Sequence, residues 1–413
     1  MLAELADLYR DLHAHPELSF EEVRTAGIAG DRLRALGYTV TEGVGRTGVV
    51  GVLERGDGPT VLLRADMDAL PVEEKTGLDY ASTARSGDTP LMHACGHDMH
   101  VTALIGALGV LASQHDWAGK IVAVFQPAEE VGAGARAMVE DGLFDRWGTP
   151  DVVLGQHVAP IPAGVLGVRS GVSFAAADAL RITLYGRGGH GSRPETTVDP
   201  VIMAAAVIQR LQTIVSREIA GSDVAVLTVG AIHAGDAANI IPDSAELRLS
   251  IRTFDEAVRE KVLAAVERIV RAEAAAAGAD REPAFETLHS FPAVRNDEAA
   301  IGRLSAAFGE HLPELLVVDP GAVTGSEDVG ILALEAGAPC AYWILGGADP
   351  APFAGKSSAE DIAAVTATLP SNHSPLFAPI IDPTIRIGVG ALTTAARAWL
   401  VPGEGSAPAS PTP

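Results

Sequence analysis

One short stretch of the sequence, LMHACGHDMHV at residues 91–101, gathers side chains that bind metal ions. It contains Cys95 together with His93, His97 and His100, although the whole chain has only 12 histidines and 2 cysteines. Thiolate and imidazole suit zinc and its neighbours in the first transition row. A helix that happens to begin with several histidines would look the same, so the stretch alone leaves both interpretations open.

Further candidate ligands follow other apolar runs of the chain. VFQPAEEVGAG supplies Glu129 and Glu130, VLGQHVAP supplies His157, and LPSNHSPLF supplies His373. Each of these residues lies just past a β-like run or in a Pro-bounded loop. In open α/β sheets, sites form beyond the carboxyl ends of the strands. The sequence therefore predicts a metal site that is assembled at one edge of a sheet.

The adjacent acids Glu129 and Glu130 can serve different roles. One carboxylate can bind metal while its neighbour stays free to act as a base. Two solvent-facing glutamates at the start of a helix, where acids favour the dipole, are the alternative. The buried strand and the Gln-Pro pair that precede them favour the functional interpretation.

The elements that must position these residues alternate between strands and helices. Two helices are predicted within residues 1–36, and a last helix at 384–400. Between them, short β-branched runs predict strands at 47–54, 60–66, 120–127 and 151–158, with helices at 99–114 and 133–140. This alternation predicts an α/β sheet.

GVGRTG, at residues 43–48, matches a dinucleotide-binding fingerprint. That fingerprint requires a strand, a turn and then a helix, whereas the strand-like VVGVL follows here. We therefore predict a glycine-rich hairpin and no dinucleotide.

A smaller domain is predicted inside the α/β domain. Its strands and helices follow the order β-α-β-β-α-β, which is the ferredoxin-like pattern. We place this domain at 174–291 and the discontinuous α/β domain at 1–173 and 292–400. The Pro/Ser/Gly-rich tail, residues 401–413, is predicted to be disordered.

Charge and composition argue against several classes of partner. The formal net charge of −23 repels nucleic acid and anionic membranes. No apolar run approaches the roughly 18 residues of a membrane-spanning helix, and no signal peptide is visible at the start. Two cysteines make no disulfide framework. We expect a cytoplasmic protein that binds neither nucleic acid nor membrane.

Several motifs occur in order along the chain: RADMDALP, MHACGHDMHVTAL, FQPAEEVGAGARAMVEDGLF, GQHVAP, GRGGHGSRP, ANIIPD, GSEDVG and NHSP. With them, the sequence resembles the M20 metallopeptidase family from about residue 5 to residue 400. It is most similar to the amidohydrolase branch, which includes hippurate hydrolases and indole-acetyl-amino-acid hydrolases. The resemblance implies a zinc-peptidase-like α/β catalytic domain that is interrupted by a ferredoxin-like lid and dimerisation domain.

The resemblance also implies a centre of two divalent metal ions. The implied ligands are Cys95, His97, Glu130, His157 and His373. Glu129 is implied as the general base that takes a proton from the attacking water. Zinc or manganese is expected, and cobalt and nickel stay open because metal availability often decides.

Three implied substrate contacts lie in the smaller domain. His190, in GRGGHGS, is implied to reach the reacting carbonyl, and Asn239 and Arg252 to contact the substrate carboxylate. A lid residue reaches the metals either by closure of its domain or across a dimer interface. We favour the second route and therefore expect a homodimer. Val131 departs from the family pattern, which usually has glycine there, and we predict that it narrows the floor of the site.

Other polar residues near these motifs have open roles. His93 and His100 could bind metal, although the resemblance prefers Cys95 and His97. Acids often orient metal-bound histidines, and the candidates here are Asp66, Asp68 and Asp98. His13 and His15 are assigned to helix ends and packing.

The leading hypothesis is a binuclear metal amidohydrolase that cleaves N-acyl-amino acids to a carboxylic acid and a free amino acid. A carboxypeptidase or dipeptidase and an N-carbamoyl-amino-acid hydrolase are alternatives, because all of these cleave an amide beside a free carboxylate. A protein that only binds amino-acid conjugates is an alternative of another class. Glu129 argues against it, since a mere binder needs no base beside the metal. Ligands scattered from position 95 to 373 argue against a structural zinc site.

Overall fold

The chain folds into two compact units. The structure is a computed structural model that describes residues 1–356 and 358–400; the predicted disordered tail lies outside the described residues. Unit 1 comprises residues 1–173, 295–321 and the described residues from 328 onward, and unit 2 comprises 174–294 and 322–327. The short segment 322–327 packs with unit 2, which the sequence patterns did not indicate.

A mixed sheet of eight strands forms the centre of unit 1, in the order β1-β2-β6-β3-β7-β18-β8-β17. The strands are β1 (Thr39–Val44), β2 (Gly48–Arg55), β3 (Thr60–Asp66), β6 (Gly119–Gln126), β7 (Val152–Pro162), β8 (Val165–Gly167), β17 (Leu316–Val318) and β18 (Cys340–Ala348). β3 runs parallel to β6 and β7, and β7 runs parallel to β18. The carboxyl ends of these four strands therefore lie at one edge of the sheet.

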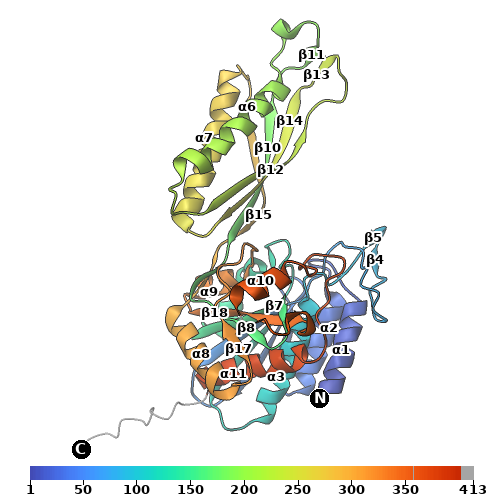
Figure 1. Cartoon of the computed structure of the whole chain (residues 1–413), viewed down its shortest axis with the longest axis vertical. Coiled ribbons are helices and arrows are strands. Elements are labelled where there is room, and N and C mark those ends of the chain that lie inside the picture. Colours follow the sequence, from blue (N-terminus) through green and yellow to red (C-terminus); the bar gives the residue numbers. More distant parts are fainter. Residues whose placement is uncertain (357, 401–413) are drawn as a thin grey trace, which may run out of the picture. The chain divides into compact units, whose positions relative to one another are not determined.

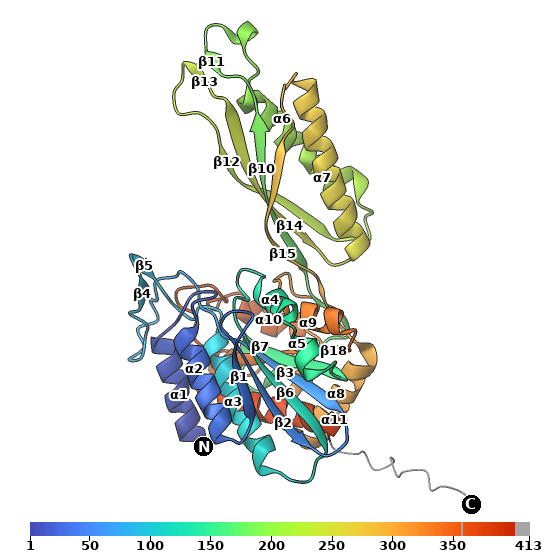
Figure 2. The ribbon, with the colours of Figure 1, turned by 180° about the vertical axis from the view of Figure 1, so that it is seen from behind.

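Helices cover both faces of this sheet (Figure 2). One face packs against α1 (Leu2–Ala14), α2 (Val23–Ala35), α3 (His97–Ser113), α8 (Glu298–His311) and α11 (Thr384–Leu400). Leu63 and Ala65 of β3 enter this core, whereas the intervening Arg64 faces the other layer, which contains α4 (Gly134–Glu140) and α9 (Val329–Ala336). This alternation is the period-two pattern of a strand that is covered on both sides.

Several short elements complete unit 1. They are β4 (Arg85–Ser86), β5 (Thr89–Pro90), α5 (Leu143–Trp147), a 3-10 turn at Ala351–Phe353 and α10 (Ala359–Thr366). The strands β9 (Gly171–Phe174) and β16 (Val294–Asn296) pair where the chain passes between the units. The strands predicted at 47–54, 60–66, 120–127 and 151–158 are confirmed. The predicted glycine-rich hairpin is also confirmed, because Val44 of β1 faces Gly48 of β2 across the turn.

Unit 2 contains a four-stranded antiparallel sheet with its own apolar core. Its strands are β10 (Ala176–Tyr185), β12 (Ala225–His233), β14 (Ser244–Thr253) and β15 (Ala284–Phe291), in the order β12-β14-β10-β15. Figure 1 shows α6 (Pro200–Thr213) and α7 (Glu256–Ala276) side by side on one face, with a π-helical turn at Ile214–Glu218 after α6. The predicted ferredoxin-like order is therefore confirmed.

The helices of unit 2 begin at acidic caps that are readable in the sequence. The side chain of Asp199 accepts a hydrogen bond from the backbone of Val201, and Asp255 does the same for Val258. Such caps satisfy amides that lack partners within the helix. A small ladder of β11 (Gly189–His190) and β13 (Ile240–Ile241) lies at one end of the unit.

No helix within residues 1–356 and 358–400 combines the length and the apolar character that crossing a bilayer requires.

Candidate metal centre

Metal-binding side chains converge at the carboxyl edge of the unit 1 sheet. Ligand atoms of Cys95, His97 and His157 all lie within 4.8 Å of one another, and so do those of Cys95, Glu130 and His373. The Cys95 Sγ is 3.5 Å from His157 Nε2, and His373 Nε2 is 3.3 Å from a Glu130 carboxylate oxygen. The structure thus brings together all five ligands that the resemblance implies.

Glycine at position 96 allows Cys95 and His97 to face the same point. Gly96 precedes α3 and has a φ of 83°, in the left-handed region that favours glycine. A β-carbon at this position would lie 2.4 Å from Val158 Cγ1, so a larger residue would also clash. Cys95 therefore ends a loop that packs against β7, and His97 begins the buried helix directly after it.

The loop that carries His373 is fastened to the same region. His373 has a φ of 69°, which is strained for a residue with a side chain. Its backbone N–H donates to Ala94, 2.8 Å away. The amide of Asn372 donates to the carbonyl oxygens of Cys95 and Val158. These bonds hold the distant C-terminal candidate ligand beside the candidate ligands from α3 and β7, with His373 on the exposed side of the cluster.

Asp68 connects the two glutamates to His97. Its carboxylate accepts hydrogen bonds from the backbone N–H groups of Glu129 and Glu130, at 3.1 and 3.0 Å. It also accepts from the Ser19 hydroxyl and lies 3.4 Å from His97 Nδ1. Burial alone would raise the pKa of Asp68, but hydrogen bonding to His97 and Ser19 holds that pKa below its usual value. An ionised Asp68 is thus available to orient both His97 and the glutamate pair.

Burial shifts the pKa values of two proposed ligands, Glu130 and Cys95. Burial is the largest cause that raises the pKa of Glu130 to about 8, and burial likewise raises the pKa of the Cys95 thiol. Among the described residues, neither His97 Nε2 nor Glu130 Oε1 has a hydrogen-bond partner, although both atoms are buried. Buried polar atoms normally have partners. Imidazole, thiolate and carboxylate together suit a divalent transition metal, so these residues fit one.

His100 and His93 differ from the three candidate ligand histidines in their contacts. His100 Nδ1 lies 2.5 Å from Asp66, and its Nε2 accepts a hydrogen bond from the Val158 N–H. His100 also forms a ligand-type group with Asp66 and His97, but because both of its ring nitrogens are engaged, its contacts favour a supporting role. His93 is buried, and burial lowers its pKa to about 4. It belongs to no metal-binding group among the described residues.

Behind the centre, a buried arginine balances two acids. Arg64 is 2% exposed and lies 2.7 Å from Asp66 and 2.9 Å from Asp328. Its Nε donates to Gln126, whose amide donates in turn to Asp328. Asp328 precedes α9 but makes no side-chain cap there, and it accepts instead from the backbone of Ala135 at the start of α4. Asp328 of the GSEDVG motif therefore helps to hold the loop between β6 and α4.

The role of His13 was missed from the sequence. His13 is fully buried, with its two ring nitrogens 2.6 Å from Asp98 and 3.1 Å from Glu74. Burial lowers its pKa, but the two carboxylates outweigh that effect and raise the pKa to about 10. A buried imidazolium thus links α1 to the N-terminus of α3. The LHAHPE motif could have indicated a constraint, but nothing local indicates that Asp98 is its partner.

The three predicted substrate contacts lie in unit 2, at two opposite ends of it. His190 and Asn239 are both exposed and lie in the β11–β13 region, just beyond the Tyr185–Ser244 end of the main sheet. Arg252 lies at the other end of β14 and is half-buried. At about 3.4 Å per residue, the strand from Ser244 to Arg252 spans roughly 27 Å. One small carboxylate cannot contact Asn239 and Arg252 of the same chain.

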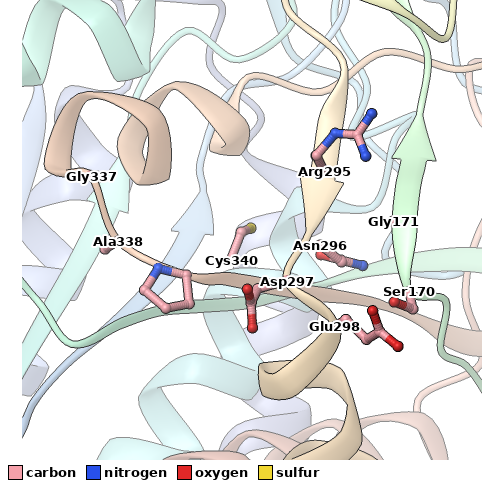
Figure 3. Close-up of a pocket in the computed structure, with 10 residues that line it drawn as sticks. Ser170, Gly171, Arg295, Asn296, Asp297, Glu298, Gly337, Ala338 and Cys340 are labelled. Carbon is pink, nitrogen blue, oxygen red and sulfur yellow. The ribbon is translucent and has the colours of Figure 1, made fainter.

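A separate cavity in unit 1 contains none of the predicted site residues. It has a volume of about 540 Å³ and is lined by Arg295, Asp297, Glu298 and Cys340, among others (Figure 3). Asn296, on the same wall, is occupied by hydrogen bonds with the backbone of Tyr342 and Arg169. Cys340 is 4% exposed, as expected for a residue of the core.

Comparisons with known proteins agree with the motifs. The family described as peptidase family M20/M25/M40 matches residues 62–369. An N-acetyl-L-cysteine deacetylase of Bacillus subtilis is 40% identical over 329 residues, which cover 79% of this chain and 76% of the relative. A hippurate hydrolase of Campylobacter jejuni is 44% identical over 62% of this chain and 66% of its own. The crystal structure of a dinuclear metal-binding M20 peptidase of Bacillus subtilis superposes with a TM-score of 0.75 and 28% identity, over 96% of this chain and 97% of that one.

The buried charge on His13 predicts how stability depends on pH. The folded-state pKa of about 10 exceeds the ordinary value of 6.5, so the stabilisation is complete below pH 6.5 and is lost as the pH rises toward 10. We expect His13→Gln to lower the free energy of unfolding by about 3–5 kcal/mol at pH 6, and by clearly less at pH 9.5. Urea unfolding of chelator-treated protein at both pH values checks this.

The exposed His15 provides the control, because His15→Gln should change stability little at either pH. A gap between wild type and His13→Gln that stays constant from pH 6 to 9.5 would contradict a buried imidazolium.

Proposed function

Because this chain belongs to the peptidase family M20/M25/M40, we propose that it is a metal-dependent amidohydrolase that cleaves N-acyl-amino acids. The products are a carboxylic acid and a free amino acid. The observation that carries the proposal is the convergence of five ligand-type side chains with the adjacent acid Glu129 at one sheet edge. The names of the two sequence relatives, a deacetylase of N-acetyl-cysteine and a hippurate hydrolase, support this substrate class.

We assign two divalent ions to the ligands Cys95, His97, Glu130, His157 and His373. Ions bound there would act as Lewis acids and would lower the pKa of a bound water toward neutrality. Zinc or manganese is our first expectation, with cobalt and nickel as alternatives. The mixture of one thiolate, three imidazoles and one carboxylate supports a transition metal over magnesium or calcium.

Glu129 is assigned the role of general base, and Glu130 that of ligand. Glu130 shares its ligand group with Cys95 and His373, which supports metal binding by its carboxylate. Glu129 is 5% exposed, and its backbone is fixed by Asp68. Its carboxylate takes a proton from the attacking water and delivers it to the departing amine. The Glu129 side chain is largely shielded from bulk water.

A homodimer formed through unit 2 would resolve the separation of the substrate contacts. β12 is an edge strand of its sheet, and its side chains Val226 and Ile232 are 49% and 48% exposed. An exposed apolar edge is a ready surface for pairing with a second copy. We propose that Arg252 serves the centre of its own chain, whereas His190 and Asn239 serve the centre of the partner. The proposed roles of unit 2 are therefore those of a lid and a dimerisation domain.

The remaining sequence predictions are retained as part of this proposal. They are a cytoplasmic location and the lack of nucleic-acid and membrane partners. A carboxypeptidase, a dipeptidase and an N-carbamoyl-amino-acid hydrolase are alternatives within the family. A non-catalytic binder of amino-acid conjugates is the alternative outside it. Substrate assays separate all four.

The proposed reaction predicts a dependence on both metal and acyl group. We expect the protein to release free amino acid from hippurate, N-acetyl-amino acids or indole-acetyl conjugates faster than from dipeptides or N-carbamoyl-amino acids. Chelation should abolish this release, and added zinc or manganese should restore it with about two equivalents per chain. Full turnover by protein shown to be metal-free by elemental analysis would overturn the two-metal proposal.

The adjacent glutamates should respond differently to the same substitution. Glu129→Gln should lower kcat by about 10²–10⁴-fold, the usual scale of general acid–base catalysis, and should keep its metals. Glu130→Gln should also lose metal affinity, because it removes a charged ligand. Glu140→Gln, an exposed acid at the end of α4, serves as the control and should change neither property. Metal-free Glu129→Gln beside fully loaded Glu130→Gln would reverse the assignment.

Mixing of variants tests whether His190 acts across the dimer. Glu129→Ala and His190→Ala chains, unfolded and refolded together in equal amounts, should regain roughly a quarter of wild-type activity, because each mixed dimer has one complete site. Mixtures of Glu129→Ala with Arg252→Ala should regain nothing beyond the separate variants, since these residues are assigned to one site. An inactive first mixture that contains verified mixed dimers would leave only closure within one chain.

A further inference from the structure

Glu22 reaches from the start of α2 into the loop that carries the two glutamates. It occupies the cap position of α2, but its side chain makes no cap bond to that helix. Instead, one carboxylate oxygen accepts hydrogen bonds from the backbone of Phe20, at 2.9 Å, and of Ala128, at 2.8 Å. The other oxygen accepts from the Thr47 hydroxyl at 2.5 Å. Glu22 is fully buried, so these bonds are shielded from water.

The amides at the start of α2 are served by a different acid. Glu17 accepts hydrogen bonds from the backbone N–H groups of Arg24 and Thr25, each at 2.8 Å, and from the Thr25 hydroxyl. Glu17 therefore performs the capping function that the position of Glu22 would suggest. The carboxylate of Glu22 is left to serve the loop between β6 and α4.

Ala128 needs such a partner because its backbone conformation is unfavourable. It directly precedes Glu129 and has a φ of 50°, in the left-handed region that residues with a β-carbon rarely adopt. Its carbonyl oxygen accepts from Ala133 and Gly134, and a β-carbon at Gly134 would lie 1.5 Å from the Pro127 oxygen. The loop is thus a tight turn that fixes both peptide groups of Ala128.

We propose that Glu22 is a positioning residue for the catalytic loop: it accepts the Ala128 N–H, holds that residue in the left-handed conformation and so aims Glu129 and Glu130. The inference rests on the roles proposed for those two glutamates. Loss of the acceptor leaves a buried N–H without a partner and removes one restraint on the strained residue. Rotation at Ala128 turns the chain immediately before the base and the ligand, so both are displaced together.

The experiment compares six proteins: wild type, Glu22→Ala, Glu22→Gln, Glu17→Ala, Ala128→Gly and the double variant Glu22→Ala/Ala128→Gly. Their zinc affinity is measured by competition with a chromophoric chelator, together with thermal stability and, with hippurate or the preferred substrate of the panel, kcat and KM. Glu22→Ala should lose about 10–100-fold in zinc affinity and kcat, the range found for outer partners of metal ligands, with a smaller change in KM. Glu22→Gln should stay close to wild type, because its amide oxygen still accepts the Ala128 N–H.

The other three variants separate positioning from general stability. Glu17→Ala should lower the melting temperature but leave zinc affinity unchanged. Ala128→Gly is the reference for the double variant. The loss of zinc affinity and kcat from Ala128→Gly to the double variant should be much smaller than the loss from wild type to Glu22→Ala, because glycine adopts a positive φ without steric cost. A purely structural role for Glu22 would give equal losses in the two backgrounds.

Several results would overturn the proposal. One is a Glu22→Ala variant with the zinc affinity and kcat of wild type. Another is a Glu22→Ala substitution that lowers zinc affinity equally in the wild-type and the Ala128→Gly background. The third is a Glu17→Ala variant that loses as much zinc affinity as Glu22→Ala. Should Glu22→Ala fail to fold, Glu22→Gln decides, and a tenfold loss in that variant would contradict the acceptor role. If wild type hydrolyses no N-acyl-amino acid, the proposed function fails, while the zinc-affinity series still tests Glu22.

Discussion

The candidate centre depends on a buried carboxylate, Asp68, which binds backbone amides at the point where strands end. A strand that stops at the sheet edge leaves N–H groups without ladder partners, and burial makes each of them costly. Asp68 accepts two consecutive amides, those of Glu129 and Glu130, and faces His97 with the same carboxylate. One group thus fixes the relative position of the proposed base and of proposed ligands from two separate elements.

Such an arrangement concentrates acids in the interior, where buried cations of the protein neutralise part of their charge. Arg64 lies between Asp66 and Asp328 behind the sheet edge, and a protonated His13 lies between Asp98 and Glu74 beside α3. Buried ion pairs of this kind add little stability over an apolar core, whereas loss of one partner is strongly destabilising. Their use is to hold elements in register. In the proposed site, bound metal ions would add positive charge beside the acids nearest the centre.

How much of the fold and of the candidate site can be predicted from the sequence depends on whether interacting residues are close together or far apart along the chain. The strands around residues 60–66 and 120–127 and the caps at Asp199 and Asp255 are encoded within a few residues, so pattern reading finds them. The proposed ligands could be picked out because each of them stands in a motif, and the structure places them close together. The contacts of Glu22 with Ala128 and of His13 with Asp98 join residues 106 and 85 positions apart. No local pattern specifies such pairs, and the roles of Glu22 and His13 were accordingly missed. The separation of Asn239 from Arg252 likewise depends on strand register.

The net charge of −23 bears on how an anionic substrate could bind. An N-acyl-amino acid carries a carboxylate, and a chain with 53 acids and 30 bases repels it at long range. Binding must therefore come from local positive charge that acts within a Debye length of the site. In the proposed site, the metal ions supply such charge at the scissile amide, and Arg252 supplies a planar fork that matches a carboxylate. Burial lowers the pKa of Arg252, yet a guanidinium stays charged at neutral pH. A half-buried arginine is weakly screened, so in the proposed site Arg252 would attract the carboxylate that the net charge of the protein repels.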